Sequence, residues 1–228
     1  MTLGYAIKRA LDYGLAAGGL LACAPAMAVL AAAIALDSRG GVFYRQDRLG
    51  RGGRPFRLLK FRTMRDAPIR FHADGSTRID PGDDRVTRVG RWLRGGADEL
   101  PQLVNVLRGE MSLVGPRPDM VSQRALYTGQ DELKLAALPG LTSLAVVLGR
   151  NDIPWKQRVA MDIRYIERWT LWLDLRILVM TLAMPLGLRV FAFSDVLDGL
   201  DLAPAPDASA APDATAAPDG SAPRARGA

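Results

Sequence analysis

The sequence predicts an α+β chain that is mostly helical, with an N-terminal re-entrant membrane helix hairpin, a small β-hairpin, and amphipathic interfacial helices around a compact domain. Three observations lead to this prediction. No charged residue occurs from Tyr13 to Leu36, residues 43–63 alternate around a glycine-rich turn, and later segments repeat apolar residues at helical spacing.

The chain has 228 residues, which is enough for one well-packed domain with additional segments. We expect residues 1–38 to be embedded in the membrane and residues 39–190 to form a cytoplasmic domain that includes the interfacial helices. Residues 200–228 repeat Ala, Pro and Asp without bulky side chains. This composition is typical of a disordered tail.

The uncharged run is as long as the roughly 20 residues that cross a bilayer as a helix. Pro25 lies near its middle, where it removes a helical hydrogen bond, so a bend is expected there. Lys8 and Arg9 precede the run and Arg39 follows it, so both flanks carry the positive charge typical of cytoplasmic ends. A re-entrant helix that bends and returns to the same face satisfies both flanks. A kinked helix that crosses once stays open as the alternative.

The segment "GVFYRQDRLGRGGRPFRLLKFRTM", residues 41–64, predicts two short strands joined by the turn "GRGGRP". Strand alternation in the second strand places Lys60 and Arg62 on one face, together with Phe56 and Leu58. The two cations are either aimed at a shared anion or belong to a solvated edge strand whose charges prevent aggregation. Residues 65–84 are polar and rich in Pro, Gly and Asp, which predicts a loop.

The helical segments follow. A first helix is expected to begin at or near Asp98, with Pro101 tolerated in its first turn, because apolar residues recur on one face: Leu100, Leu103, Val104 and Leu107. A second helix is expected in residues 155–169 with an apolar side formed by Trp155, Val159, Ile163 and Ile166. Residues 171–191 are apolar but interrupted by charges, which suits a helix lying at the membrane interface.

The net charge is +6, and residues 39–70 contain ten Lys or Arg against two acids. Such a segment attracts nucleic acid, anionic lipid headgroups or phosphorylated small molecules. Nucleic acid is disfavoured because the segment lacks interleaved aromatic residues for base stacking. Cys23 is the single cysteine and His72 the single histidine, so any metal is expected to have oxygen ligands.

The candidate catalytic residues lie in residues 95–118, "GGADELPQLVNVLRGEMSLVGPRP". An ionised carboxylate beside cations can act as a nucleophile toward phosphorus or as a Mg²⁺ ligand, and Asp98 and Glu99 lie between the cations Arg94 and Arg117. The alternative is that Asp98 is a helix N-cap with Glu99 in the first turn. Arg117 lies between two prolines, which either pre-organises a phosphate-binding guanidinium or makes a simple turn.

Three blocks of the sequence resemble the bacterial sugar transferase family, the monotopic polyprenyl-phosphate phosphoglycosyl transferases: "FYRQDRLGRGGRPFRLLKFRTM", "DELPQLVNVLRGEMSLVGPRP" and "LGRNDIPWKQRVAMDIRYIERWTLWLDLRIL". The resemblance implies an enzyme that transfers a phosphosugar from a nucleoside diphosphate sugar, usually a UDP-sugar, to polyprenyl phosphate, with release of UMP. It further implies a cytoplasm-facing catalytic domain on the bacterial inner membrane, in contact with membrane lipids. The oligomeric state is left open, with a homodimer as one option.

Carried over to this chain, the resemblance implies that Asp98 forms a covalent phosphosugar intermediate and that Glu99 binds Mg²⁺. The expected substrate-binding residues are Lys60, Arg62, Arg94, Arg117, Arg150 and Asn151. The chain departs from the family pattern in three places: "RGGADE" before the acidic pair, Ala24-Pro25 at the membrane bend, and "GLTSLAVVLGRN" before residue 152. A rival function is a membrane-tethered basic module that binds anionic lipid or nucleic acid without catalysis.

Overall fold

The computed structural model describes residues 3–65, 70–71, 77–78, 82–149 and 153–184. Its α-helices are α1 (Leu3–Asp37), α2 (Arg88–Leu93), α3 (Gln102–Leu107), α4 (Leu144–Leu148), α5 (Trp155–Glu167) and α6 (Leu171–Ala183). Its strands are β1 (Phe43–Leu49), β2 (Pro55–Phe61), β3 (Arg70–Phe71), β4 (Thr77–Arg78), β5 (Ser112–Val114) and β6 (Gly140–Thr142). Short 3₁₀ helices are η1 (Arg51–Gly53), η2 (Ala97–Glu99), η3 (Val121–Leu126) and η4 (Gly129–Ala136). The mixed, mostly helical class that the sequence predicts is confirmed.

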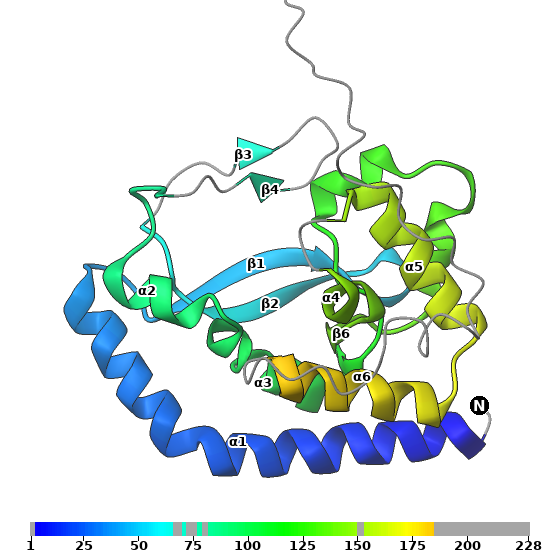
Figure 1. The fold of residues 1–228 in the computed structure, drawn as a ribbon, viewed down its shortest axis with the longest axis horizontal. Helices are drawn as coiled ribbons and strands as arrows, with labels where there is room; N and C mark the ends of the chain where they lie inside the picture. The colour runs from blue at the N-terminus through cyan, green and yellow to red at the C-terminus, as the bar shows by residue number, and fades with distance from the viewer. Residues whose placement is uncertain (1–2, 66–69, 72–76, 79–81, 150–152, 185–228) are drawn as a thin grey trace, which may run out of the picture.

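Helix α1 is one continuous helix of 35 residues that contains Pro25. Figure 1 shows that α1 is bent and that its concave side faces the rest of the protein, with β1 and β2 above it. The bend agrees with the loss of a helical hydrogen bond that proline causes. The expected bend therefore lies within one continuous helix.

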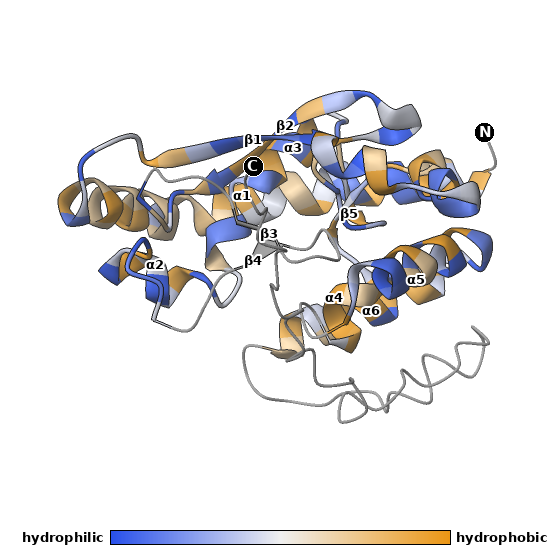
Figure 2. Cartoon of the chain, turned by 90° about the horizontal axis from the view of Figure 1, so that it is seen from above, coloured by the Kyte–Doolittle hydropathy of each residue, from blue (hydrophilic) through white to orange (hydrophobic). Residues whose placement is uncertain are grey.

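One stripe of α1 packs against the protein while the rest of its surface is apolar and exposed. Three of its buried residues, Lys8, Asp12 and Ala16, are spaced four apart, and Ile34 is buried near its C-terminal end. Between these, Leu21 is 78 % exposed, and only 6 % of the most apolar stretch of the helix is buried. The helix is long and apolar enough to cross a bilayer, and Figure 2 shows its hydrophobic character along most of its length. An apolar surface this extensive suits contact with lipid.

Buried ion pairs fix the N-terminal part of α1 to the domain. The Lys8 ammonium donates to Asp174 Oδ2 of α6 at 2.6 Å and to the Val114 carbonyl of β5 at 2.9 Å. The Asp12 carboxylate accepts from the Ser112 hydroxyl at 2.8 Å and from the backbone N–H of Leu113 at 3.0 Å.

These contacts correct the sequence interpretation of the N-terminal charges. Lys8 is buried, and Arg9 donates to Asp12 at 2.9 Å and to the Met111 carbonyl at 3.0 Å. The pair is neutralised inside the protein, so it is not the free positive flank from which orientation was inferred. Asp174 is likewise buried, with Lys8 as its partner.

The predicted β-hairpin is confirmed. Strands β1 and β2 pair antiparallel from Leu49–Pro55 at the turn to Phe43–Phe61 at the far end. Gly52 and Gly53 adopt φ values of 67° and 73° in the turn, a left-handed conformation that glycine adopts without strain. In the segment predicted as a loop, β3 and β4 form a small antiparallel pair.

A second strand pair was not predicted. β5 and β6 pair parallel, with Ser112 opposite Gly140 and Val114 opposite Thr142, although η3 and η4 separate them in sequence. Each strand is only three residues long, so neither shows the alternation that identifies a strand from sequence. The main core surrounds this pair and includes Leu113, Val114 and Ile177.

Gly140→Ala is expected to destabilise the protein by about 1–3 kcal/mol because β6 approaches the chain at Gly115 too closely for a methyl group. A Cβ at residue 140 would lie 2.2 Å from the Gly115 backbone nitrogen. Thermal unfolding of the purified protein in detergent measures the loss. Gly18→Ala is the matched control, because a Cβ there meets nothing within 4 Å. Equal melting temperatures for the two variants would contradict the argument.

Helices occur within the segments that the sequence predicts to be helical, with two corrections. The segment that was expected to begin near Asp98 begins as η2 and continues as α3 from Gln102. Helix α5 is confirmed, and Trp155 and Val159 are buried as expected. Its inner face continues through Asp162 and Tyr165, whereas Ile163 and Ile166 are only partly buried. The pattern of apolar residues could not show this, because a buried Asp appears polar in sequence.

Candidate active site

The acidic pair lies in η2, between α2 and α3, in front of the C-terminal end of β2. Gly96 precedes η2 with φ 129° and ψ −19°, a conformation that side chains rarely adopt, and it turns the chain into the 3₁₀ helix. No side chain caps η2 or α3. Asp98 is therefore not an N-cap, and this alternative is wrong. The Asp98 side chain is partly exposed, as a reacting group must be.

Glu99 is held by two cations from separate segments. Lys60 of β2 donates to Glu99 Oε1 at 2.6 Å, and an Arg117 guanidinium nitrogen lies 3.5 Å from the same oxygen. The side chain of Glu99 is 21 % exposed. The structure thus brings together four residues that the sequence placed in the site, namely Lys60, Asp98, Glu99 and Arg117.

The electrostatics separate the two carboxylates. Burial raises the pKa of Glu99, but the charges of Lys60 and Arg117 overcome it and lower the pKa to about 2. Burial raises the pKa of Asp98 above its ordinary value of 3.8, and the positive charge of Lys60 opposes this effect while Glu99 adds to it. Glu99 is therefore a permanent anion at neutral pH. Asp98 is the more basic member of the pair and the better nucleophile.

The Pro116-Arg117-Pro118 segment is rigidly mounted. Both prolines are buried, and the Arg117 backbone N–H donates to Asp162 Oδ2 of α5 at 3.1 Å. The side chain extends to Glu99 and remains partly exposed. The expectation of a pre-organised guanidinium agrees with this geometry, because little backbone freedom is left to lose on binding an anion.

A buried ionic network behind Arg117 was not found from the sequence. The Lys134 ammonium, 3 % exposed, lies 2.6 Å from Asp119 Oδ2 and 3.2 Å from Asp162 Oδ2. Asp119 also accepts from the Tyr127 hydroxyl at 2.7 Å and from Trp155 Nε1 at 3.2 Å. These residues are far apart in sequence, so no local spacing signals them.

Arg48 of β1 is a further cation at the site that sequence reasoning missed. Its guanidinium donates to the Pro118 carbonyl at 2.9 Å and to Gln46 Oε1. Burial and the nearby charge of Arg117 lower its pKa to about 10, while Glu99 acts in the opposite direction. In the sequence, Arg48 is one of ten basic residues between positions 39 and 70. Only the register of β1 and β2 shows that its side chain faces the site.

The other predicted residues that the structure describes, Arg62 and Arg94, do not bind Glu99. Arg62 donates to the carbonyls of Ser38, at 2.7 Å, and Arg39 at the end of α1, so it does not share an anion with Lys60. The expectation of a shared anion is wrong because the backbone carbonyls that follow α1 bind this guanidinium. Arg94 caps α2, and its charge lowers the pKa of Asp98 slightly. Arg150 and Asn151 lie outside the described residues.

Lys60→Met is expected to move the acidic limb of the activity profile to higher pH. Lys60 is the strongest influence that lowers the pKa of both Asp98 and Glu99. Without it both pKa values rise, so a higher pH is needed to ionise both groups. Transfer rates measured from pH 5 to 9 test the shift. Arg57→Met is the control, because Arg57 lies on the same strand with its side chain 77 % exposed. A shift of equal size in both variants would contradict the assignment.

The carboxylate pair suits a hard divalent cation. Among the described residues, both donors to Glu99 bind Oε1, so Oε2 remains for a metal. No cluster of three His, Cys, Asp or Glu side chains exists within the described part of the chain. The donor set therefore fits Mg²⁺, which one or two carboxylates and substrate phosphates commonly hold together.

Comparison with known proteins identifies the family. Residues 3–187 match the family described as bacterial sugar transferase. The chain belongs to this family. It is an enzyme, as the acidic pair and its cations predict.

Several curated sugar transferases are similar to the chain. A UDP-glucose:undecaprenyl-phosphate glucose-1-phosphate transferase of Caulobacter vibrioides is 45 % identical over 183 residues, which cover 76 % of this chain and 67 % of that protein. An exopolysaccharide production protein ExoY of Rhizobium meliloti is 38 % identical over 193 residues, which cover 79 % and 85 %. An undecaprenyl-phosphate glucose phosphotransferase of Komagataeibacter xylinus is 43 % identical over 190 residues, which cover 77 % of this chain but 35 % of that protein.

Proposed function

We propose that this sugar transferase moves a sugar phosphate from a nucleoside diphosphate sugar, with UDP as the nucleotide, to polyprenyl phosphate and releases UMP. The observation that supports this most directly is the acidic pair: one partly exposed carboxylate adjoins a second that two cations hold ionised. Similarity to proteins named for transfer from UDP-glucose to undecaprenyl phosphate supports the substrate classes.

The proposed reaction has two displacements at one phosphorus atom. In the first, an Asp98 carboxylate oxygen bonds to the phosphorus that carries the sugar, and the bond from that phosphorus to the bridging oxygen breaks. UMP leaves with the electron pair. In the second, an oxygen of polyprenyl phosphate bonds to the same phosphorus and the Asp98 carboxylate is regenerated. Asp98 is thus the nucleophile in the first step and the leaving group in the second, which predicts ping-pong kinetics.

The cations give each step its electrostatic support. Lys60 and Arg117 converge on Glu99 from β2 and from the proline-flanked segment, so a phosphate beside Asp98 meets both positive charges. Arg94 adds a third charge near Asp98. Fixed cations stabilise the charge that develops on the phosphoryl oxygens without reorganisation during the reaction.

We propose that Glu99, through Oε2, holds Mg²⁺ together with the substrate diphosphate. The bound ion would neutralise charge on the departing UMP. Lys60 and Arg117 both bind the other oxygen of Glu99, Oε1, so Oε2 is available to the ion.

The placement in the membrane is also part of the proposal. The bent α1 would enter the cytoplasmic leaflet of the bacterial inner membrane and return to the same face, so that the catalytic domain lies in the cytoplasm. In this orientation the carboxylate pair lies at headgroup depth, where a lipid phosphate is found. The product would enter a glycoconjugate or exopolysaccharide pathway, in agreement with the names of the ExoY relatives.

The proposal is tested by trapping the intermediate. The detergent-solubilised protein is incubated with a panel of UDP-sugars and Mg²⁺ in the absence of acceptor. We expect one equivalent of UMP to be released in a burst and intact-protein mass spectrometry to show one added sugar phosphate, located at Asp98. Addition of undecaprenyl phosphate should remove the adduct. UMP release that requires the acceptor, without any adduct, would overturn the covalent mechanism. Absence of transfer for every sugar nucleotide would favour the rival function, a membrane-tethered basic module that binds anionic lipid or nucleic acid without catalysis.

A further inference from the structure

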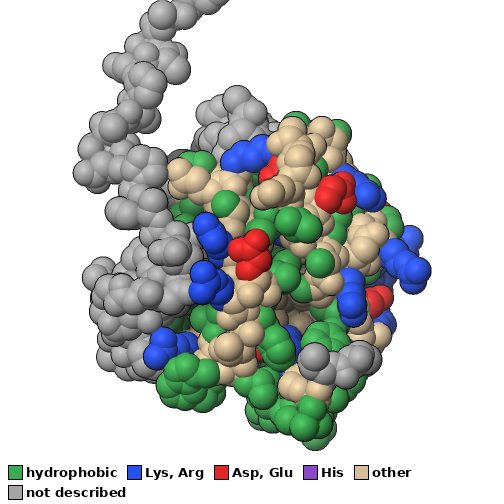
Figure 3. Space-filling model, turned by 90° about the vertical axis from the view of Figure 1, so that its right-hand side faces the viewer, with side chains coloured by type: hydrophobic (Ala, Val, Ile, Leu, Met, Phe, Trp, Pro, Cys, Tyr) green, Lys and Arg blue, Asp and Glu red, His purple; other side chains and the backbone are tan. Residues whose placement is uncertain are grey.

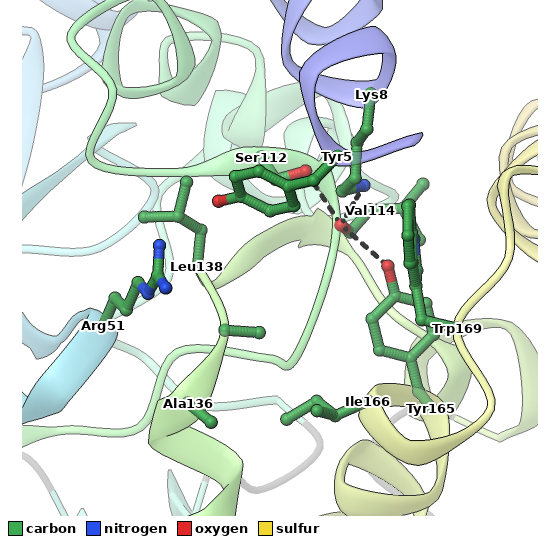
Figure 4. A pocket seen from close by; sticks show the side chains of 11 residues that line it. Tyr5, Lys8, Arg51, Ser112, Val114, Ala136, Leu138, Tyr165, Ile166 and Trp169 are labelled. Carbon is green, nitrogen blue, oxygen red and sulfur yellow. Dashed lines mark hydrogen bonds between the residues drawn. The ribbon is translucent and has the colours of Figure 1, made fainter. Parts of the chain in front are cut away.

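A pocket of about 160 Å³ lies at the N-terminal end of α1, and Ser112 and Val114 of β5 form part of its wall. Figure 4 shows two groups of side chains that face each other across it. Tyr5, Arg51 and Leu138 form one side, and Tyr165, Ile166 and Trp169 form the other. Residues from α1, η1, α5 and the segment after η4 therefore meet at this pocket.

Lys8, Tyr165 and Trp169 line the pocket, and their polar groups already have hydrogen-bond partners. The Lys8 ammonium donates to the Val114 carbonyl at 2.9 Å and to the Asp174 carboxylate at 2.6 Å. The Tyr165 hydroxyl, which has one hydrogen, donates to the same carboxylate at 2.6 Å and lies 3.2 Å from the Val114 carbonyl. The Trp169 ring N–H donates to the same carboxylate at 3.0 Å. These side chains thus present their apolar parts to the pocket. A ligand would find an apolar interior there and not a site for a sugar or a nucleotide.

Arg51 is the exception. Its guanidinium lies 5.9 Å from the centre of the Tyr5 ring, and no carboxylate among the described residues lies within ion-pair distance of it. Arg51 is exposed in the η1 turn at the rim of the pocket. An apolar interior with one available cation at its rim is complementary to an amphiphile with an anionic headgroup.

The pocket adjoins exposed apolar side chains of α1 and α6. Leu3 of α1, near Tyr5, is 78 % exposed, and Trp172 in the first turn of α6 is 57 % exposed. Figure 3 shows hydrophobic side chains along the lower edge of this end of the molecule, with Lys and Arg above them. Tryptophan and arginine at such a boundary are typical of the headgroup level of a membrane.

The pocket is separate from the carboxylate pair. Arg51 lies in the turn of the hairpin, beside the pair that Leu49 forms with Pro55. Lys60 pairs with Tyr44 near the opposite end of the hairpin. Five residues of strand between Pro55 and Lys60 span about 17 Å. A group bound at Arg51 therefore does not occupy the place of a phosphate at Asp98.

We propose that this pocket binds one anionic glycerophospholipid of the surrounding membrane. Its phosphate contacts Arg51, and a segment of one acyl chain enters between Tyr5 and Trp169. The volume is close to that of a protein cavity that accommodates benzene, so it holds part of one chain and not a whole lipid tail. The bound lipid fixes the depth of the N-terminal half of α1 and leaves the carboxylate pair accessible to its substrates.

Native mass spectrometry of the full-length protein tests the proposal. Delipidated protein in detergent is titrated with phosphatidylglycerol, and we expect one molecule to bind tightly in preference to neutral phosphatidylcholine. Arg51→Gln should weaken this binding about five-fold, the value of one charge near an anionic headgroup. Arg54→Gln, an exposed arginine of the same turn that does not line the pocket, should leave it unchanged.

A second variant tests the binding site for the acyl chain independently of charge. Ala136→Trp places a large ring in the pocket and should abolish the tight binding, whereas Ala160→Trp, exposed on α5, should not. Unchanged melting temperatures verify that the variants fold.

Equal binding by all variants would overturn the proposal, as would the lack of preference for the anionic lipid. Displacement of phosphatidylglycerol by equimolar undecaprenyl phosphate, with a raised acceptor KM in Arg51→Gln, would also overturn it and assign the pocket to the acceptor chain. The lipid-site proposal rests on the proposed function, so transfer activity of Arg51→Gln is measured separately at a saturating concentration of UDP-sugar. Failure of the lipid site is then distinguishable from failure of the proposed reaction.

Discussion

Asp98→Asn is expected to lower sugar-phosphate transfer by roughly four to six orders of magnitude, the loss typical of a missing nucleophile. The amide has nearly the volume of the carboxylate but lacks the charged oxygen that bonds to phosphorus. The substitution leaves the fold intact, because no described side chain or helix end depends on Asp98 for a cap. It also removes the negative charge next to Glu99, so binding of the anionic sugar nucleotide should persist or improve.

The measurement is UMP release with undecaprenyl phosphate and the preferred UDP-sugar, together with the binding affinity for the sugar nucleotide. Asp98→Ala should be made in parallel, because slow deamidation of the introduced asparagine would regenerate active enzyme. Asp47→Asn is the control, since its carboxylate lies on the exposed face of β1. A rate for Asp98→Ala within ten-fold of the wild type would exclude a nucleophilic role.

The sequence predicted those parts of the site that depend on neighbouring residues in the chain. Strand alternation placed Lys60 on the inner face of β2, and the acidic pair and the proline-flanked Arg117 are visible as short motifs. The structure confirms that these residues meet, with Glu99 at the centre. Arg62 was misassigned from the same alternation, because the pattern shows which face a side chain takes but not which partner it binds.

Other features could not be predicted because distant residues create them. Lys8 was interpreted as a flanking charge, yet its partner Asp174 is 166 residues away. The same holds for Asp162, which interrupts the apolar face of α5 and is fully buried. A charged residue on an amphipathic helix is usually exposed, so only the tertiary structure shows that these carboxylates are internal ligands for lysine.

Lys134→Met is expected to destabilise the protein by about 3–5 kcal/mol, the loss typical of removing one partner of a buried ion pair. Lys134 is the cation between Asp119 and Asp162, and methionine would leave two buried carboxylates that repel each other. The melting temperature should fall by roughly 10 °C or more. Lys156→Met is the matched control, since its ammonium pairs with Asp131 at the surface and is 49 % exposed. Such a pair contributes about 1 kcal/mol or less.

The pH dependence of the Lys134→Met defect separates electrostatic loss from poor packing. Burial raises the pKa of Asp162 to about 6, and Lys134 opposes this rise, so the pKa of Asp162 climbs further in the variant. A group whose pKa is raised by folding stabilises the folded state below its unfolded pKa and loses this contribution as the pH rises through the folded value. The defect should therefore be smaller at pH 5 than at pH 8, whereas a packing defect would be equal at both.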